Sequence, residues 1–272
     1  MDLRSVSVRS LLPPRPGGFA RRVGANQPRQ RVHDARTAVE KPLLPMTPVN
    51  RGGETSAAYV PSENPEVFLQ LPQHQQRMQE AFMDIGTFPA MHEIVPSVWL
   101  GNQTAAGILM PYQQADVAEA SGLRASTLKE LRQRRISHII CCSEEDTTAA
   151  QPFRNEGIVY HSDLLLDGGL LNCDADELAK ANAQFAAFFA KSMDLMRTAL
   201  EAGGAVLVHC NSGANRSSSV VAGYMMLTQG KRFDEVMPII FEKRPIVCPR
   251  YWQWLVAEVE PQAVAHRYAV LR

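Results

Sequence analysis

The sequence predicts an α/β fold in which a central mixed, largely parallel sheet of about four or five strands is flanked by helices. Short apolar runs of strand length alternate with longer segments of helical periodicity over residues 93–262, and this order of elements is typical of α/β proteins. The apolar run Ala205–His209 ends at Cys210, and a helical segment follows from about Ser217. A strand, a tight loop and a helix are therefore expected around this thiol.

Composition limits the class of protein. The 272 residues carry no net charge, but residues 1–51 hold ten Lys and Arg against three Asp and Glu. An acidic body with a basic arm argues against a nucleic-acid-binding core. No apolar run approaches the length of about 18 residues that a transmembrane helix needs, so we expect neither a nucleic acid nor a membrane as partner.

The cysteines indicate a reducing compartment. They are odd in number, and they lie at Cys141, Cys142, Cys173, Cys210 and Cys248. The adjacent pair does not suit a disulfide framework, no CxxC pair suggests zinc, and no secretory signal precedes them. We expect no metal, no cofactor and a cytoplasmic location, with the nucleus as an open alternative.

The first 55 residues differ in composition from the rest, because Arg, Pro, Gly, Ser and Gln dominate them. Repeated prolines break helices, and without sustained apolar periodicity we expect a disordered basic arm over residues 1–55. Two alternatives stay open. One is an organelle-targeting peptide, since Arg and Ser abound while acids are few; the other is a docking segment at Lys41–Met46.

Three further segments follow the arm. Residues 56–92 are expected to form a lead-in that packs on the main domain, with one helix from Gln73 to Ile85. Residues 93–262 form the main domain, and residues 263–272 form a C-terminal tail.

The main domain offers four apolar stretches of strand length. They are Ile94–Gly101, which a turn at Pro96-Ser97 divides into two short strands, Ile136–Cys142, Ile158–Leu166 and Ala205–His209.

Helices are expected between and after these strands. Thr127 and Glu130 have the spacing of a capping box, which predicts a helix to about Arg135. Four more helices are predicted. The first begins with Asp174 and Asp176 and ends near Glu201, and the second runs from about Ser217 to Gln229 with Gly230 as C-cap. The third runs from a cap at Asp234 to Lys243, and the fourth from about Arg250 to Glu260.

The loop after Cys210 has the residues of an oxyanion site. A short loop between a buried strand and a helix N-terminus points backbone N–H groups inward, and the helix dipole adds positive charge. Gly213 allows a close turn around a ligand, and Arg216, which five residues separate from Cys210, offers a planar donor pair that matches phosphate oxygens. The same field lowers the pKa of a thiol and makes it a nucleophile at neutral pH.

This segment resembles the signature of cysteine-dependent protein phosphatases, His-Cys-x-x-Gly-x-x-Arg-Ser. The flanking chain is similar to the dual-specificity phosphatases over about residues 93–260. The similar stretches are Ile94–Asn102, Ile136–Cys142, Tyr160 with Asp167, Gly204–His209, and Arg244-Pro245 with Pro249. The resemblance implies a protein-tyrosine-phosphatase-like fold.

The resemblance also implies roles for individual residues. Cys210 would be the nucleophile, Asp167 the general acid and then the base, and Ser217 the hydrogen-bond donor to the sulfur. Arg216 would bind the phosphate together with the backbone of Asn211, Ser212, Gly213, Ala214 and Asn215. His209 would support the loop from inside. Asp163 is the second candidate for the acid.

The expected substrates are phosphorylated proteins, protein kinases among them. The loop side chains of Asn211, Ser212, Ala214 and Asn215 are uncharged, whereas relatives that act on inositol phosphates usually carry charged residues there. By resemblance, a shallow pocket would admit phosphotyrosine, phosphoserine and phosphothreonine.

Cys142 ends a strand that should lie beside the strand of Cys210. In some relatives a cysteine there forms a reversible disulfide with the nucleophile, so Cys142 is a candidate redox partner. The alternative is a small buried core residue.

Two other functions compete with an active protein phosphatase. A catalytically weak phospho-binding or scaffold module would have the same fold, but such relatives usually lack the Cys or the Arg. A low-molecular-weight phosphatase or arsenate reductase would carry its loop near the chain start, whereas this loop follows Cys210.

Overall fold

The computed structural model describes residues 75–77, 79–80, 89–108, 117–143, 150–167 and 174–270. The chain divides into two units after Glu54, and every described residue lies in the second. The predicted basic arm 1–55 and most of the predicted helix Gln73–Ile85 lie outside the described residues. Of the lead-in, Arg77 donates to the Glu242 carbonyl at 3.0 Å.

A five-stranded sheet forms the centre of the second unit, in the order β1-β2-β5-β3-β4. The strands are β1 Met91–Val95, β2 Val98–Gly101, β3 Ile136–Cys141, β4 Val159–Ser162 and β5 Ala205–His209. Only β1 and β2 are antiparallel; the pairs β2–β5, β5–β3 and β3–β4 are parallel. The predicted mixed, largely parallel sheet is therefore confirmed.

The turn predicted at Pro96-Ser97 joins β1 to β2. Ser97 has φ of +65°, a left-handed conformation that a short polar residue adopts in tight turns. Its N–H donates to the Glu93 carboxylate at 2.8 Å, so the turn is fixed by a side chain of the preceding strand.

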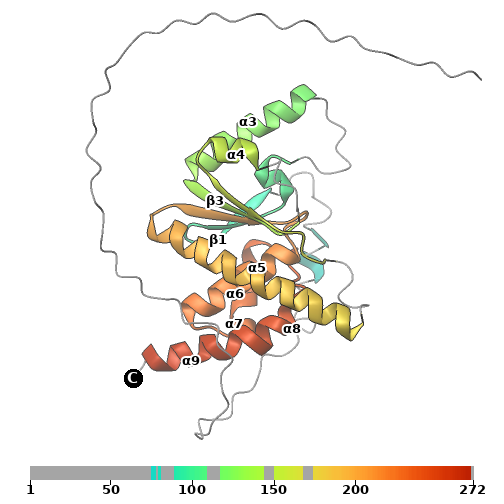
Figure 1. Cartoon of the computed structure of the whole chain (residues 1–272), viewed down its shortest axis with the longest axis vertical. Coiled ribbons are helices and arrows are strands. Elements are labelled where there is room, and N and C mark those ends of the chain that lie inside the picture. The colour runs from blue at the N-terminus through green and yellow to red at the C-terminus, as the bar shows by residue number, and fades with distance from the viewer. Residues whose placement is uncertain are drawn as a thin grey trace, which may run out of the picture. The chain divides into compact units, whose positions relative to one another are not determined.

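One face of the sheet is covered by η1 Gln103–Ala106, α3 Val117–Gln133 and α4 Gln151–Asn155, as Figure 1 shows for α3 and α4. Leu131 and Phe153 pack there against Ile139 and Leu207 of the sheet. The capping box predicted at Thr127 is wrong, because α3 begins ten residues earlier, at Val117, and Thr127 is a buried residue within the helix.

The other face carries the C-terminal helices and the larger core (Figure 1). They are α5 Ala175–Glu201, α6 Arg216–Gln229, α7 Phe233–Lys243, α8 Trp252–Trp254, the π-helical turn η2 Leu255–Val259 and α9 Glu260–Val270. Asp174 caps α5 in a capping box with Glu177, and Gly230 ends α6 with φ of +61°, both where the sequence predicts them.

Three boundaries differ from the prediction. The N-cap of α7 is Arg232, and Asp234 lies in the first turn instead of capping it. The strand expected to reach Leu166 ends at Ser162, and an extended segment continues from it. Helical structure continues beyond Glu260 to Val270, because the π-helical turn before it accommodates Pro261, which lacks an N–H. Among the described helices, none has the length and hydropathy that crossing a membrane requires.

Candidate active site

Cys210 lies at the carboxyl end of β5, the central strand. All five residues of β5 are buried, as expected for a parallel strand covered on both faces. In open α/β sheets, ligands bind beyond the carboxyl ends of the strands. Cys210 is 1% exposed, so its thiol lies at the floor of any site formed here.

The loop Asn211–Asn215 presents its carbonyl groups to neighbouring elements. The Asn211 carbonyl accepts from the Gln103 N–H at 3.1 Å, and the Ala214 carbonyl accepts from the Cys248 N–H at 2.8 Å. Because carbonyls and N–H groups point in opposite directions along a tight loop, these outward bonds leave the N–H groups facing the thiol. The loop can therefore hold an oxyanion.

Arg244 fixes the middle of the same loop. Its side chain is fully buried and donates to the carbonyls of Ser212 at 2.9 Å and Gly213 at 3.0 Å. It also contacts the His92 Nδ1 at 3.0 Å. Burial, and then the charge of Arg244, lower the pKa of His92 to about 4, so a neutral imidazole accepts this bond at neutral pH.

Gly213 is required where the loop passes closest to β2. Its φ is +71°, and a Cβ at this position would lie 2.5 Å from the Gly101 carbonyl oxygen. Any other residue would therefore displace the backbone. Immediately after the loop, α6 begins at Arg216, so its N-terminal dipole points toward the thiol and favours an anion there.

Arg216 joins the loop to the segment that follows β4. Its guanidinium donates to the Leu165 carbonyl at 3.3 Å and lies 3.2 Å from the Asp167 carboxylate. The Asp167 side chain is 34% exposed, whereas Asp163 accepts a hydrogen bond from Gln184 at 3.0 Å. The structure therefore brings Asp167 beside Arg216, and it engages Asp163 elsewhere.

Burial and hydrogen bonding have opposite effects on the pKa of Cys210. Burial raises the pKa of the thiol, but the Ser217 hydroxyl and N–H, the charge of Arg216 and the Gly213 N–H lower it further than burial raises it. The Ser217 Oγ donates to the Cys210 Sγ at 3.1 Å. The net effect is a pKa below the ordinary value, which favours the nucleophilic thiolate.

The His209 side chain contacts β3 and β4, and its predicted support of the loop stays a prediction. It is fully buried, and its ring meets Tyr160 of β4 edge-on, with centroids 6.4 Å apart. Burial raises the pKa of the neighbouring Cys141, but the charge and the hydrogen bond of His209 bring it down to about 7. His209 thus belongs to a buried polar cluster behind the site.

Cys142 lies beside Cys210 as the strand order predicts. Its N–H donates to the His209 carbonyl at 2.9 Å, and both cysteines belong to the same core cluster. Burial, and then the negative charges of Cys210 and Cys141, raise the pKa of Cys142 well above its ordinary value. The two neighbouring thiols therefore have pKa values shifted in opposite directions, and a disulfide between Cys142 and Cys210 stays a prediction.

Two contacts near the site have no sequence motif that predicts them in advance. Tyr251 donates its hydroxyl to the Leu166 carbonyl at 2.8 Å, which fixes the residue before Asp167. Arg244 belongs to a stretch that the sequence resemblance includes, but its bonds to the loop carbonyls depend on tertiary structure. Besides that resemblance, the sequence signal for Arg244 is its position at the end of a largely apolar helix.

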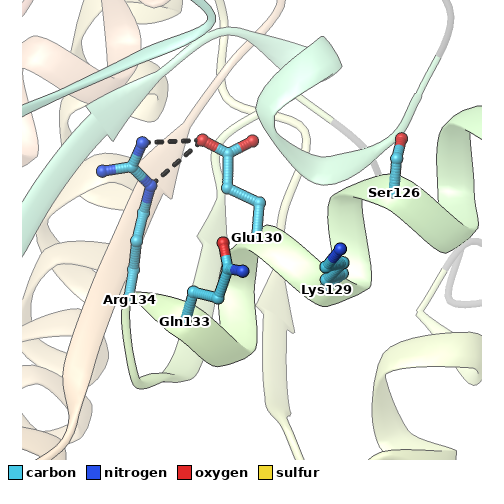
Figure 2. A pocket seen from close by; sticks show the side chains of 5 residues that line it. All are labelled: Ser126, Lys129, Glu130, Gln133 and Arg134. Atoms are coloured by element: carbon cyan, nitrogen blue, oxygen red, sulfur yellow. Dashed lines mark hydrogen bonds and ion pairs between the residues drawn. The ribbon is translucent and has the colours of Figure 1, made fainter.

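An open pocket of about 460 Å³ lies elsewhere, along the outer side of α3. Figure 2 shows that its lining comes from one helix, with Glu130 accepting from Arg134 at 2.7 Å. Arg134 also lies over the Trp99 ring, 4.2 Å from its centroid. Because α3 covers the face of the sheet opposite the Cys210 core, this pocket is separate from the candidate active site. Within the described ranges, no cluster of three or more His, Cys, Asp or Glu residues could hold a metal ion.

Known proteins resemble parts of this chain. Human serine/threonine/tyrosine-interacting protein is 27% identical over 67% of this chain and 68% of its own length. Mouse dual specificity protein phosphatase 1 is 30% identical over 25% of this chain, and the match spans 19% of the relative. The crystal structure of human DUSP28 covers 64% of this chain and 95% of its own, at 20% identity and a TM-score of 0.46.

A family profile matches the centre of the chain. The profile described as the dual specificity phosphatase catalytic domain matches residues 120–260, which is more than half of the chain. This stretch contains Asp167, Cys210 and Arg216. The chain belongs to the dual-specificity phosphatase catalytic-domain family.

Proposed function

We propose that this protein hydrolyses phosphotyrosine, phosphoserine and phosphothreonine in proteins through a cysteinyl-phosphate intermediate. One arrangement carries the proposal: the Cys210 thiol, with its lowered pKa, lies within the loop that ends at Arg216, and Arg216 holds the Asp167 carboxylate at 3.2 Å. Nucleophile, phosphate ligand and acid are then neighbours.

In the first step, the Cys210 sulfur attacks phosphorus and the bond from phosphorus to the ester oxygen breaks. Protonated Asp167 gives its proton to that oxygen, so that a neutral hydroxyl leaves. Arg216 and the loop N–H groups stabilise the charge on the transferred phosphoryl group.

In the second step, water attacks the phosphorus of the intermediate and the phosphorus–sulfur bond breaks. The Asp167 carboxylate takes a proton from the water, and inorganic phosphate is the product. Ser217, which donates to the sulfur at 3.1 Å, stabilises the departing thiolate.

Replacing the nucleophile tests the proposal directly. We expect Cys210→Ser to lower phosphate release from para-nitrophenyl phosphate by more than about 10⁴-fold, since no thiolate remains to accept the phosphoryl group. Asp167→Asn should lower kcat on a phosphoserine peptide by about 10²–10⁴-fold. The matched control is Asp163→Asn, which keeps an oxygen that can accept from Gln184 and should leave kcat unchanged.

The alternative is a phospho-binding module with weak catalysis. The similarity to human serine/threonine/tyrosine-interacting protein over two thirds of the chain favours keeping it. If wild type and Cys210→Ser release phosphate equally slowly while both bind phosphopeptides, the enzyme proposal fails and the binding module takes its place.

A further inference from the structure

Exposed apolar side chains gather on one stretch of the described chain. Among the residues that the structure describes, three large apolar side chains are exposed: Val159 at 43%, Leu164 at 46% and Leu166 at 39%. Two of these three flank Leu165, which is 1% exposed, and they lie within three residues of Asp167. Exposed apolar side chains that are grouped together mark a site of contact more often than isolated ones do.

Alternation along an extended chain explains the outward positions. Leu165 faces the core and belongs to the same cluster as Cys142 and Cys210, so its two neighbours face away from the core. Backbone contacts hold this orientation. The Leu165 N–H donates to the Cys142 carbonyl at 3.3 Å.

The backbone on either side is held as well. The Leu164 carbonyl accepts from Gln184 at 3.1 Å, and the Leu166 carbonyl accepts from Tyr251 at 2.8 Å. Rotation of the segment would break these bonds and expose Leu165 instead. Leu164 and Leu166 are therefore presented outward by a fixed backbone.

The position of Leu164 and Leu166 close to Asp167 indicates what kind of group contacts them. The Leu165 carbonyl contacts the guanidinium of Arg216, and Asp167 contacts the same guanidinium. A substrate whose leaving oxygen meets Asp167 brings its neighbouring residues close to the segment just before Asp167. The side chain that meets Leu164 and Leu166 therefore belongs to the substrate chain, next to the phosphorylated residue.

We propose that Leu164 and Leu166 form an apolar subsite for a hydrophobic residue flanking the phosphorylated residue of a protein substrate. The inference rests on the proposed function and names its substrate class: phosphoproteins with an apolar residue beside the phosphosite. On the loop itself, the exposed side chains of Asn211 and Ser212 carry no charge, so the loop adds no cation that would favour acidic flanks instead.

Matched phosphotyrosine peptides test the subsite. The peptides differ only beside the phosphotyrosine, where they carry Leu, Ser or Glu. We expect wild type to favour the Leu peptide over the Glu peptide by about tenfold in kcat/KM, chiefly through KM, because the apolar side chain is removed from water. Leu164→Ser and Leu166→Ser should each reduce this preference about threefold or more.

The control is Val159→Ser, which removes an equally exposed apolar side chain from the far end of β4. We expect Val159→Ser to keep the full preference, and all three variants to hydrolyse para-nitrophenyl phosphate at the wild-type rate, because that substrate has no flanking residue. An unchanged preference in both leucine variants, or an equal loss in Val159→Ser, overturns the subsite. So does sedimentation showing that these leucines join two copies of the chain.

The test separates this inference from the proposed function. Peptide dissociation constants are also measured on the full-length Cys210→Ser protein by fluorescence anisotropy. If wild type releases no phosphate but the Cys210→Ser protein still prefers the Leu peptide, the hydrolase proposal fails and the apolar subsite stands.

Discussion

At the scale of single residues, the reactivity of Cys210 depends on Ser217 more than on any other neighbour. Burial in the core works against the thiolate, and the Ser217 hydroxyl is the largest of the contributions that outweigh it. Arg216 and the loop N–H groups add to it. The Ser217 hydroxyl therefore lowers the pKa of the thiol before any substrate is bound, in addition to its role in the proposed second step.

Removing this hydroxyl should shift the ionisation of the thiol. In Ser217→Ala, the pKa of Cys210 should rise, so the fraction of thiolate at a given pH below it falls. The pH dependence of Cys210 alkylation by iodoacetate, followed by mass spectrometry, should move to higher pH. Ser192→Ala, which removes another fully buried helical hydroxyl, should leave the profile in place, and a coincident profile for Ser217→Ala would contradict the assignment.

The sequence predicts those site residues whose chemical type and spacing together form a recognisable motif. Cys210, Arg216 and Ser217 belong to one short motif, and the resemblance predicts Asp167 as the acid, with Asp163 as the alternative. The ties formed by Arg244 and Tyr251 could not be predicted, because each reaches a backbone carbonyl at least 31 positions away in the chain. Backbone carbonyls carry no residue identity that a sequence pattern could reveal.

At the scale of elements, the geometry of the loop depends on the residue that follows α7. Arg244 bonds two consecutive loop carbonyls and has a neutral His92 behind it. A guanidinium can serve all of these acceptors at once because its donors are fixed in a fork, whereas an ammonium cannot.

Arg244→Lys should therefore keep the positive charge and lose the fork of donors that holds the loop carbonyls. We expect kcat on para-nitrophenyl phosphate to fall by about 10–100-fold, because loop N–H groups that are misaligned stabilise the phosphoryl group less well. Inhibition by vanadate should weaken in parallel. The control Arg197→Lys changes an exposed arginine on α5 that pairs with Glu201; equal kinetics in the two variants would show that Arg244 does not position the loop.

Helix boundaries show where local sequence rules gave way to tertiary structure. The pair Thr127 and Glu130 has capping spacing, but Thr127 packs beneath Gly107, so burial fixes it inside α3. At the other end, the helix predicted to end near Glu260 continues after a π-helical turn as α9 to Val270. At Thr127, tertiary packing therefore outweighs a local capping signal of about 1 kcal/mol.

At the scale of the whole molecule, two glycines in helices should respond in opposite directions to the same substitution. In α6, a Cβ on Gly223 would lie 2.5 Å from the Phe189 ring and 2.9 Å from Leu255. In α3, a Cβ on Gly122 would meet nothing within 4 Å. Helix propensity favours alanine at both positions by about 1 kcal/mol.

Urea unfolding should separate the two effects. Gly122→Ala is expected to raise the free energy of unfolding by about 0.5–1 kcal/mol. Gly223→Ala is expected to lower it by about 1–3 kcal/mol, because overpacking between α5, α6 and η2 outweighs the propensity. A stabilised Gly223→Ala protein would mean that α6 can move away from α5 without cost.

The strand order has a consequence for how the protein loses activity. β5 has a hydrogen-bonded partner on each side, whereas β4, which leads to Asp167, lies at an edge of the sheet. Amide hydrogens of a central strand exchange only through global opening, while those of an edge strand exchange through cheaper local openings. The proposed nucleophile Cys210 and the proposed acid Asp167 therefore belong to different cooperative units. Under the proposed mechanism, we expect mild denaturation to abolish first the turnover of alkyl phosphates, which need the acid, while aryl phosphates with good leaving groups are still cleaved until the centre of the sheet opens.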